Sequence, residues 1–360
     1  MIRPPDYVLS VRPYVPGKPI EELERELGIS NSVKLASNEN PVGPSPAAVE
    51  AAGKALSDIN RYPDGSGYYL KKVLSERLSV REDEVILGNG SNELIDIAVR
   101  TFMTDGDEAV MAVPSFVVFS MGVQLVGGIC VQVPLKDYVH DLEAMAAAVT
   151  PRTKMLFIAN PNNPTGTLNR QEEFDRMMAK MPDDLIVVLD EAYYEYVTDP
   201  GYADSMKYLH SDKNVLILRT FSKIYGLAGL RVGYGVAKQE ILTDMNRSRE
   251  PFNTNSIAQK AAIAALDDEE HLRRSREVNE GGKEYLYRRL DEMGMKYVPT
   301  EANFIYMPVP EAPALYEQLL GLGVIVRPMG PDSIRVTIGL PEENRRFVEA
   351  LGRVAVSREV

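Results

Sequence analysis

The stretch RTFSKIYGLAGLRVGY, residues 219–234, decides the fold expected of this chain. It begins within the apolar run NVLILRT (214–220), which predicts a buried strand, and it places Lys223 directly after that strand. Ser222 precedes the lysine and Arg231 follows it by eight residues. Ligands of open parallel sheets bind at the carboxyl ends of strands, so Lys223 is expected to face a binding site. An isolated lysine there is more often a solvated loop residue, so its role depends on the partners described below.

Short apolar runs alternate with expected helices from Val85 to Val236. The runs are VIL (85–87), AVMAV (109–113), ICVQV (129–133), KMLFIA (154–159), LIVVLD (185–190) and NVLILRT (214–220). Helices are expected from Ser91, near Phe116, over Asp141–Ala148 and near Gln171. Continuous apolar strands between helices predict an α/β fold whose parallel sheet is covered on both faces.

The 360 residues are enough for a large domain with a smaller one beside it. A proline-rich start with a short helix at 19–27 predicts an N-terminal arm over residues 1–30, and residues 31–265 form the expected large domain. Residues 256–292 read as helical and include a long charged stretch that links the domains. Strands at 303–309, 324–328 and 333–339 and a final helix from Glu342 predict a small α+β domain over 266–360.

Composition and charge exclude several classes of protein. The net charge is −12 and the basic residues are scattered, which argues against a nucleic-acid surface. No apolar stretch approaches the ~20 residues of a membrane span, and the start lacks a signal-peptide core, so we expect a cytoplasmic protein. The three histidines have no metal-ligand spacing and are expected at the surface or at helix ends. Cys130, the one cysteine, is expected to be a buried strand residue.

Asp190 closes the apolar run LIVVLD, where a buried carboxylate is costly unless it meets a cation. Pyridoxal 5′-phosphate (PLP) would supply that cation, because its ring nitrogen must stay protonated to draw electrons from a substrate. Tyr193 and Asn163, the latter within NPNNPTG, can hydrogen-bond the ring oxygen of PLP and lower the pKa of a Schiff base on Lys223. A turn or cap residue is the alternative for Asp190, and a rigid loop is the alternative for NPNNPTG.

A phosphate group needs backbone N–H groups at a helix start together with cations. GNGSNELID offers such a start after the strand that ends near Leu87, and Glu93 stands where a dinucleotide fingerprint requires glycine. The expected phosphate ligands are Gly90, Ser91, Asn92, Ser222 and Arg231.

Two further residues complete the predicted site. Phe116 is placed to stack on the pyridine ring, although a core aromatic would serve equally well. Arg335 is a charge inside the apolar strand SIRVTIG, and a buried cation there is expected to bind the carboxylate of a substrate.

Seven blocks, in order along nearly the whole chain, resemble the fold-type I PLP-dependent aminotransferases, and within them the histidinol-phosphate aminotransferase family. The blocks are RPYVPGKPIEEL (12–23), KLASNENPVGPSP (34–46), NRYPDG (60–65), NPNNPTG (160–166), LDEAYYEY (189–196), residues 219–234 and IRVTIG (334–339). The resemblance implies a mainly parallel seven-stranded sheet between helices. It also implies transfer of an amino group from histidinol phosphate to 2-oxoglutarate in histidine biosynthesis.

The resemblance further implies roles for single residues. Lys223 would be the Schiff-base lysine and proton shuttle, with Asp190 on the ring nitrogen and Tyr193 and Asn163 on the ring oxygen. Tyr62, in RYPDG, would reach the cofactor phosphate of a partner subunit, which implies a homodimer with shared active sites. The implied substrate contacts are Tyr14, Asn40, Arg327 and Arg335.

Several alternatives stay open at this point. An aromatic amino-acid aminotransferase and a PLP-dependent decarboxylase of a phosphorylated amino acid use related pockets. A non-catalytic regulator on the same scaffold would carry a basic DNA-binding segment, which the sequence does not show. A dehydrogenase is disfavoured by the failed glycine fingerprint.

Overall fold

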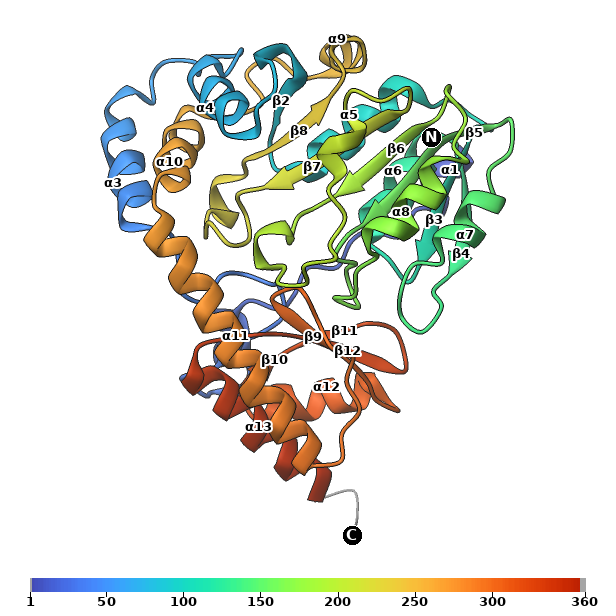
Figure 1. The fold of residues 1–360 in the computed structure, drawn as a ribbon. Helices are drawn as coiled ribbons and strands as arrows, with labels where there is room; N and C mark the ends of the chain where they lie inside the picture. The colour runs from blue at the N-terminus through green and yellow to red at the C-terminus, as the bar shows by residue number, and fades with distance from the viewer. Residues whose placement is uncertain (1, 357–360) are drawn as a thin grey trace.

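A seven-stranded sheet forms the centre of the larger domain in the computed structural model, which describes residues 2–356 (Figure 1). Its order is β2-β8-β7-β6-β5-β3-β4. The strands are β2 (Val85–Gly88), β3 (Glu108–Val113), β4 (Ile129–Pro134), β5 (Thr153–Ala159), β6 (Ile186–Asp190), β7 (Asn214–Thr220) and β8 (Gly233–Ala237). Strands β4, β3, β5, β6 and β7 run parallel, whereas β8 is antiparallel to both β7 and β2. The predicted α/β class is confirmed, but the sheet is mixed because of this one reversed strand.

Helices cover both faces of the sheet because successive strand residues point to opposite sides. In β5, Leu156 and Ile158 belong to one buried cluster, and Met155 and Phe157 belong to the other. Helices α3, α4, α7, α8 and α10 pack against the cluster that contains Leu156 and Ile158. Helices α5, α6 and α9 pack against the cluster that contains Met155 and Phe157. The helices are α3 (Pro46–Ala55), α4 (Tyr68–Leu78), α5 (Ser91–Phe102), α6 (Val117–Leu125), α7 (Leu142–Ala147), α8 (Gln171–Met178), α9 (Gln239–Ser248) and α10 (Ser256–Leu266). Short 3₁₀ helices lie at Leu56–Asp58, Glu82–Glu84, Tyr194–Tyr196, Ser205–Tyr208 and Ala228–Leu230.

The smaller domain is reached through α11 (Glu269–Glu292), which runs from the large domain down one side of the small one (Figure 1). The predicted helical linker is therefore two helices, α10 and α11. The small domain contains β9 (Phe304–Pro308), α12 (Ala312–Gly321), β10 (Val324–Ile325), β11 (Arg327–Pro328), β12 (Ser333–Thr337) and α13 (Pro341–Val356). Strands β11, β12 and β9 form an antiparallel sheet in that order.

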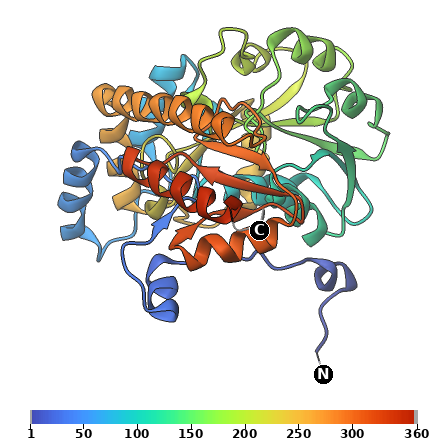
Figure 2. The same ribbon diagram turned by 90° about the horizontal axis from the view of Figure 1, so that it is seen from below.

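The N-terminal segment lies along the small domain. Helix α2 (Ile20–Leu27) buries Leu23 against Ile325, and β1 (Val33–Lys34) pairs parallel with β10. From α2 the chain extends across the molecule to α1 (Asp6–Ser10), as the view from below shows (Figure 2). The predicted divisions after residues 30 and 265 remain predictions.

Two residues differ from their expected environment. His140 directly precedes the N-cap of α7, as expected of a helix-end residue, but it is buried, and burial lowers its pKa to about 4. Cys130 lies on β4, which is one of the two edge strands of this sheet, and is only partly buried. A run of apolar residues cannot by itself reveal whether a strand is central or at the edge, because that depends on the order of strands in the sheet.

Candidate active site

A cavity of about 310 Å³ lies where the parallel strands of the large domain end and face the small domain. The structure brings most of the predicted site residues to its wall: Tyr14, Ser91, Asn92, Phe116, Asn163, Asp190, Tyr193, Ser222, Lys223, Arg231, Arg327 and Arg335. Among the described lining residues, four are cationic and two, Glu39 and Asp190, are acidic. The cavity therefore favours anionic ligands.

Three predicted residues do not line this cavity. Gly90 is the N-cap of α5 and directly precedes Ser91, which lines the cavity. Tyr62 is exposed at the surface and stacks on Phe252, with ring centroids 4.7 Å apart. Asn40 is buried, and its amide donates to the carbonyl of Ile224 at 2.7 Å and to the hydroxyl of Ser275 at 2.9 Å. In this structure the Asn40 side chain supports the loop that follows Lys223, and its substrate contact remains a prediction.

Lys223 lies in the turn that follows β7. Its Nζ donates to the carbonyl of Ser37 at 3.3 Å and lies 5.6 Å from the ring centre of Tyr193. Burial, followed by the nearby guanidinium of Arg335, lowers the pKa of Lys223 to about 8. An amine with that pKa has a substantial neutral fraction near physiological pH and is therefore nucleophilic.

Asp190 ends β6 with only 4% of its surface exposed. Its Oδ1 accepts the backbone N–H of Ala192 at 3.0 Å, and burial raises the pKa of its carboxyl group to about 6. A buried carboxylate that faces a cavity is best satisfied by a cation in that cavity.

The other end of the cavity is built for an anion. The first turn of α5 presents Ser91 and Asn92, and Arg231 reaches the hydroxyl of Ser222 at 3.3 Å. Gly90 has φ +79°, and a Cβ atom there would lie 2.4 Å from the guanidinium of Arg231. Only glycine permits this close approach, so the N–H groups at the start of α5 and the guanidinium of Arg231 lie around one anion site. We call this site, formed by Gly90, Ser91, Asn92, Ser222 and Arg231, the phosphate cup.

Arg335 joins the two domains at the site. It lies on β12, 9% exposed, and its guanidinium donates to Asn163 Oδ1 at 2.6 Å and to the carbonyl of Ala36 at 2.7 Å. Arg327 faces it in register on β11 and lies 5.1 Å from the ring centre of Tyr14. Two arginines thus stand at the small-domain end of the cavity.

These features fit PLP. The cofactor carries a ring nitrogen that a buried carboxylate can hold protonated, an aldehyde that condenses with an amine, and a phosphate. Asp190, Lys223 and the cup around Arg231 present the matching groups within one cavity. No group of three or more potential metal-ligating side chains occurs between residues 2 and 356, and none of the helices in that range could span a membrane.

Two features of the site escaped sequence analysis. Asn38 donates its amide to the hydroxyl of Tyr193 at 2.9 Å, and its backbone has φ +55°. Glu191 and Arg219 form a buried ion pair at 2.8 Å directly behind Asp190. The acidic residue after Asp190 and the arginine that opens the quoted stretch were visible signals for this pair, whereas the contact of Asn38 joins residues that are remote in sequence.

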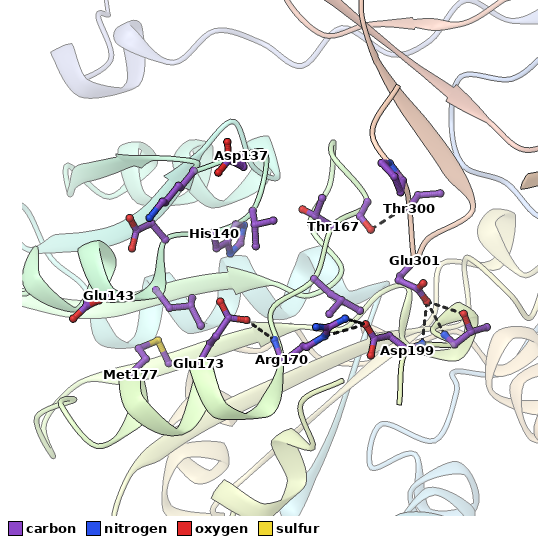
Figure 3. Close-up of a pocket in the computed structure, with 18 of the residues that line it drawn as sticks. Asp137, His140, Glu143, Thr167, Arg170, Glu173, Met177, Asp199, Thr300 and Glu301 are labelled. Atoms are coloured by element: carbon purple, nitrogen blue, oxygen red, sulfur yellow. Dashed lines mark hydrogen bonds and ion pairs between the residues drawn. The ribbon is translucent and has the colours of Figure 1, made fainter. Parts of the chain in front are cut away.

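A larger cavity of about 840 Å³ lies on the far side of the NPNNPTG loop, between α8 and the segment that leads into β9 (Figure 3). Several of its charged groups already have partners in the wall: Arg170 pairs with Asp199 at 2.8 Å, and Glu301 accepts the backbone N–H of Thr198 at 2.7 Å. Neither Lys223 nor Asp190 lines it. The smaller cavity is therefore the candidate active site.

Comparison with known proteins agrees with this geometry. Residues 30–351 match the model of the aminotransferase class I and II family, so the chain belongs to this family of PLP-dependent enzymes. The histidinol-phosphate aminotransferase of Moorella thermoacetica is 52% identical over 353 residues, which cover 96% of this chain and 92% of the relative. Histidinol-phosphate aminotransferase 1 of Nitrosococcus oceani is 47% identical over 96% of this chain and 95% of its own length. Within the class, these relatives place the chain among the histidinol-phosphate aminotransferases.

A solved structure shares the whole fold. The histidinol-phosphate aminotransferase of Sinorhizobium meliloti, crystallised in complex with PLP, superposes with a TM-score of 0.90 at 28% identity and covers 98% of this chain and 97% of its own. The family assignment contradicts the regulator and dehydrogenase alternatives.

Proposed function

We propose that the enzyme holds PLP in the smaller cavity and transfers the amino group of histidinol phosphate to 2-oxoglutarate. Asp190 would bind the ring nitrogen, Lys223 the aldehyde, Asn163 and Tyr193 the ring oxygen, and Phe116 would stack on the ring. The phosphate would be held by Gly90, Ser91, Asn92, Ser222 and Arg231.

PLP, when bound, supplies an aldehyde that condenses with amines and a cationic ring that withdraws electrons from the attached carbon. The chain supplies the rest. Arg335 orients the substrate by a charge-assisted hydrogen bond to its anionic group. Once the incoming amine has displaced it, Lys223 would take the proton from the substrate carbon that bears the amino group. It would return this proton to the cofactor carbon that is bonded to the same nitrogen. Its pKa of about 8 suits both proton uptake and release near neutral pH.

The choice of substrate depends on one observation, the pair of arginines at the small-domain end of the cavity. Arg327 and Arg335 face each other in register on β11 and β12, with Tyr14 over Arg327. Such a pair suits a donor that carries a phosphate and an acceptor that carries two carboxylates. The names of the two relatives described above, histidinol-phosphate aminotransferases, support the same substrate.

A panel of amino donors with 2-oxoglutarate tests the proposal, with histidinol phosphate, phenylalanine and aspartate as members. We expect histidinol phosphate to have the highest kcat/KM. Lys223→Ala should bind PLP without the absorption band of a lysine-linked cofactor and lose nearly all transamination. Substantial turnover by that variant would overturn the role of Lys223.

The two alternative activities have separate tests. An aromatic aminotransferase would lose phenylalanine and histidinol phosphate activity equally in Arg327→Ala, whereas we expect KM to rise mainly for the phosphorylated donor. A decarboxylase would release carbon dioxide from a phosphorylated amino acid without needing 2-oxoglutarate. Neither outcome fits the proposal.

We also propose a homodimer in which Tyr62 reaches the cofactor phosphate of the partner subunit. Tyr62 is 83% exposed, and Ile59, Tyr69 and Phe252 are exposed large apolar residues close to it in sequence or in space. Sedimentation should show a dimer, and Tyr62→Phe should weaken PLP binding without changing the urea unfolding of the PLP-free protein. A monomer with full activity would contradict this arrangement.

The proposed reaction belongs to amino-acid biosynthesis, and for that reason we assign the enzyme to the cytoplasm. Fractionation of cells that produce the natural chain tests this assignment.

A further inference from the structure

Asn38 lies beside Tyr193 in the wall of the cavity, with 1% of its surface exposed. Its Nδ2 donates to the Tyr193 hydroxyl at 2.9 Å, and its carbonyl accepts from Asn303 at 3.0 Å. Its backbone has φ +55°, a conformation that asparagine adopts more readily than most residues. The residue is therefore held in place by both its backbone and its side chain.

Thr337 fixes the orientation of the Asn38 amide. The Thr337 hydroxyl accepts the backbone N–H of Asn38 at 2.9 Å and donates to Asn38 Oδ1 at 3.1 Å. If the amide were turned over, the buried Thr337 hydroxyl would have no acceptor among the side chains and backbone groups of residues 2–356. The NH₂ group of Asn38 consequently faces Tyr193.

The Tyr193 hydroxyl keeps its proton at physiological pH. Burial raises the pKa of Tyr193 to about 12, and the guanidinium of Arg335 is the main opposing influence. The other titratable groups that face it are Asp190, Tyr14, Tyr196 and the amine of Lys223. Because the phenol is neutral, what matters is the direction in which its single proton points.

We propose that Asn38 is a positioning residue, which occupies the acceptor side of the Tyr193 oxygen and so directs the Tyr193 proton into the cavity, toward the ring oxygen of PLP. A hydroxyl that accepts one hydrogen bond also donates a stronger one. The inference rests on the proposed function, because it requires PLP in the cavity. In this proposal Asn38 acts through its hydrogen bond to Tyr193 and not by direct contact with the cofactor or the substrate.

The consequence is a lower pKa for the nitrogen that links Lys223 to the cofactor. A hydrogen bond to the ring oxygen stabilises that oxygen as an anion and so favours the unprotonated linkage. If Asn38 no longer donates, the donation from Tyr193 weakens and the linkage holds its proton to higher pH.

Two substitutions test this without straining the backbone. Asn38→Asp keeps the shape and the bond from Thr337 but presents an acceptor, so Tyr193 donates to residue 38 instead of to PLP. Asn38→Gly removes the side chain and tolerates the positive φ. The measurement is a pH titration of the visible absorbance of the PLP-loaded enzyme, which reports protonation of the linkage.

We expect the absorbance midpoint to rise by about one pH unit in Asn38→Asp and by less in Asn38→Gly, the size of a single hydrogen bond. Tyr193→Phe is the matched background. In that background Asn38→Gly should cause no further shift, and Asn38→Asp should retain only the small effect of its added charge. Equal shifts with and without the Tyr193 hydroxyl, or no shift in either variant, would overturn the inference.

Thr337→Val provides a second route if Asn38→Asp does not fold. Valine has the shape of threonine, and without the hydroxyl the Asn38 amide loses its orientation, so the midpoint should again rise only where Tyr193 is present. A wild-type enzyme without an absorbance band from linked PLP would refute the proposed function. A wild-type titration that no variant changes would refute the role of Asn38 alone.

Discussion

Replacing Asp190 by asparagine should stabilise the cofactor-free enzyme while it weakens PLP binding. Burial raises the pKa of Asp190 from 3.8 to about 6, so the folded state disfavours the charged carboxylate. Below about pH 4 the carboxyl group is protonated in both the folded and the unfolded chain, and stability is at its full value. As the pH rises through about 6 this stability is lost, because the unfolded chain ionises more easily than the folded one. A shift of about two pKa units corresponds to about 3 kcal/mol lost at pH 8, and to roughly half of that at pH 5.

Asparagine removes this cost because it is neutral at every pH, and its Oδ1 can still accept the N–H of Ala192. Urea unfolding of PLP-free protein, at equal protein concentration, should show Asp190→Asn to be more stable than the wild type by about 3 kcal/mol at pH 8. The advantage should shrink at pH 5. A wild type more stable than the variant at pH 8, or a difference independent of pH, would refute this electrostatic argument.

Addition of PLP should reverse the order of the two proteins. The pyridinium of bound PLP would neutralise Asp190 in the wild type, whereas asparagine offers it no charge. PLP should therefore raise the melting temperature of the wild type more than that of the variant. If the increase is equal, Asp190 does not hold the ring nitrogen.

Three further substitutions have defined outcomes. Arg219→Met leaves Glu191 buried without its cation and should lower the free energy of unfolding in urea by about 3–5 kcal/mol. Adding Glu191→Gln to the same chain should restore part of this loss. A loss below about 1 kcal/mol would contradict the buried ion pair. Gly90→Ala places a Cβ atom 2.4 Å from Arg231 at a positive φ and should raise the Kd for PLP at least about tenfold by fluorescence titration; an unchanged Kd would argue against the phosphate cup. In Gly166→Ala the new Cβ atom would lie 2.0 Å from Thr300 Oγ1 at φ +76°, so the free energy of unfolding should fall by about 2 kcal/mol or more. An unchanged free energy of unfolding would contradict this close contact between the domains.

Local patterns predicted most of the fold because each apolar run of the large domain became one strand. The direction of β8 could not be foreseen, since GYGVA reads the same whether the strand is parallel or antiparallel. The environment of Cys130 depended on β4 being at the edge, and strand order is a property of the whole sheet. His140 is at a helix end as expected, but its burial could not be predicted because it depends on segments such as the one that carries Asn169.

Twelve of the fifteen predicted site residues line one cavity, and those of the large domain, such as Asp190 and Lys223, meet there because they follow the ends of neighbouring strands. The resemblance to known aminotransferases supplied Tyr14 and Arg327, which nothing in local composition distinguishes. Asn38 was beyond prediction for a physical reason. Its contacts join residues 38, 193 and 337, which are brought together only by the packing of the small domain on the large one.

Arg335 and Thr337 lie two residues apart on β12 and therefore on the same face of that strand. One contacts Asn163 and the other orients Asn38, so a single strand reaches both groups proposed to hold the ring oxygen of the cofactor. In the proposed arrangement, the binding of the substrate by Arg335 and the protonation of the cofactor linkage therefore both depend on β12. On this proposal, exchanging β12 to accept a new donor would also change the absorbance and reactivity of the bound cofactor, so the two properties would have to be engineered together.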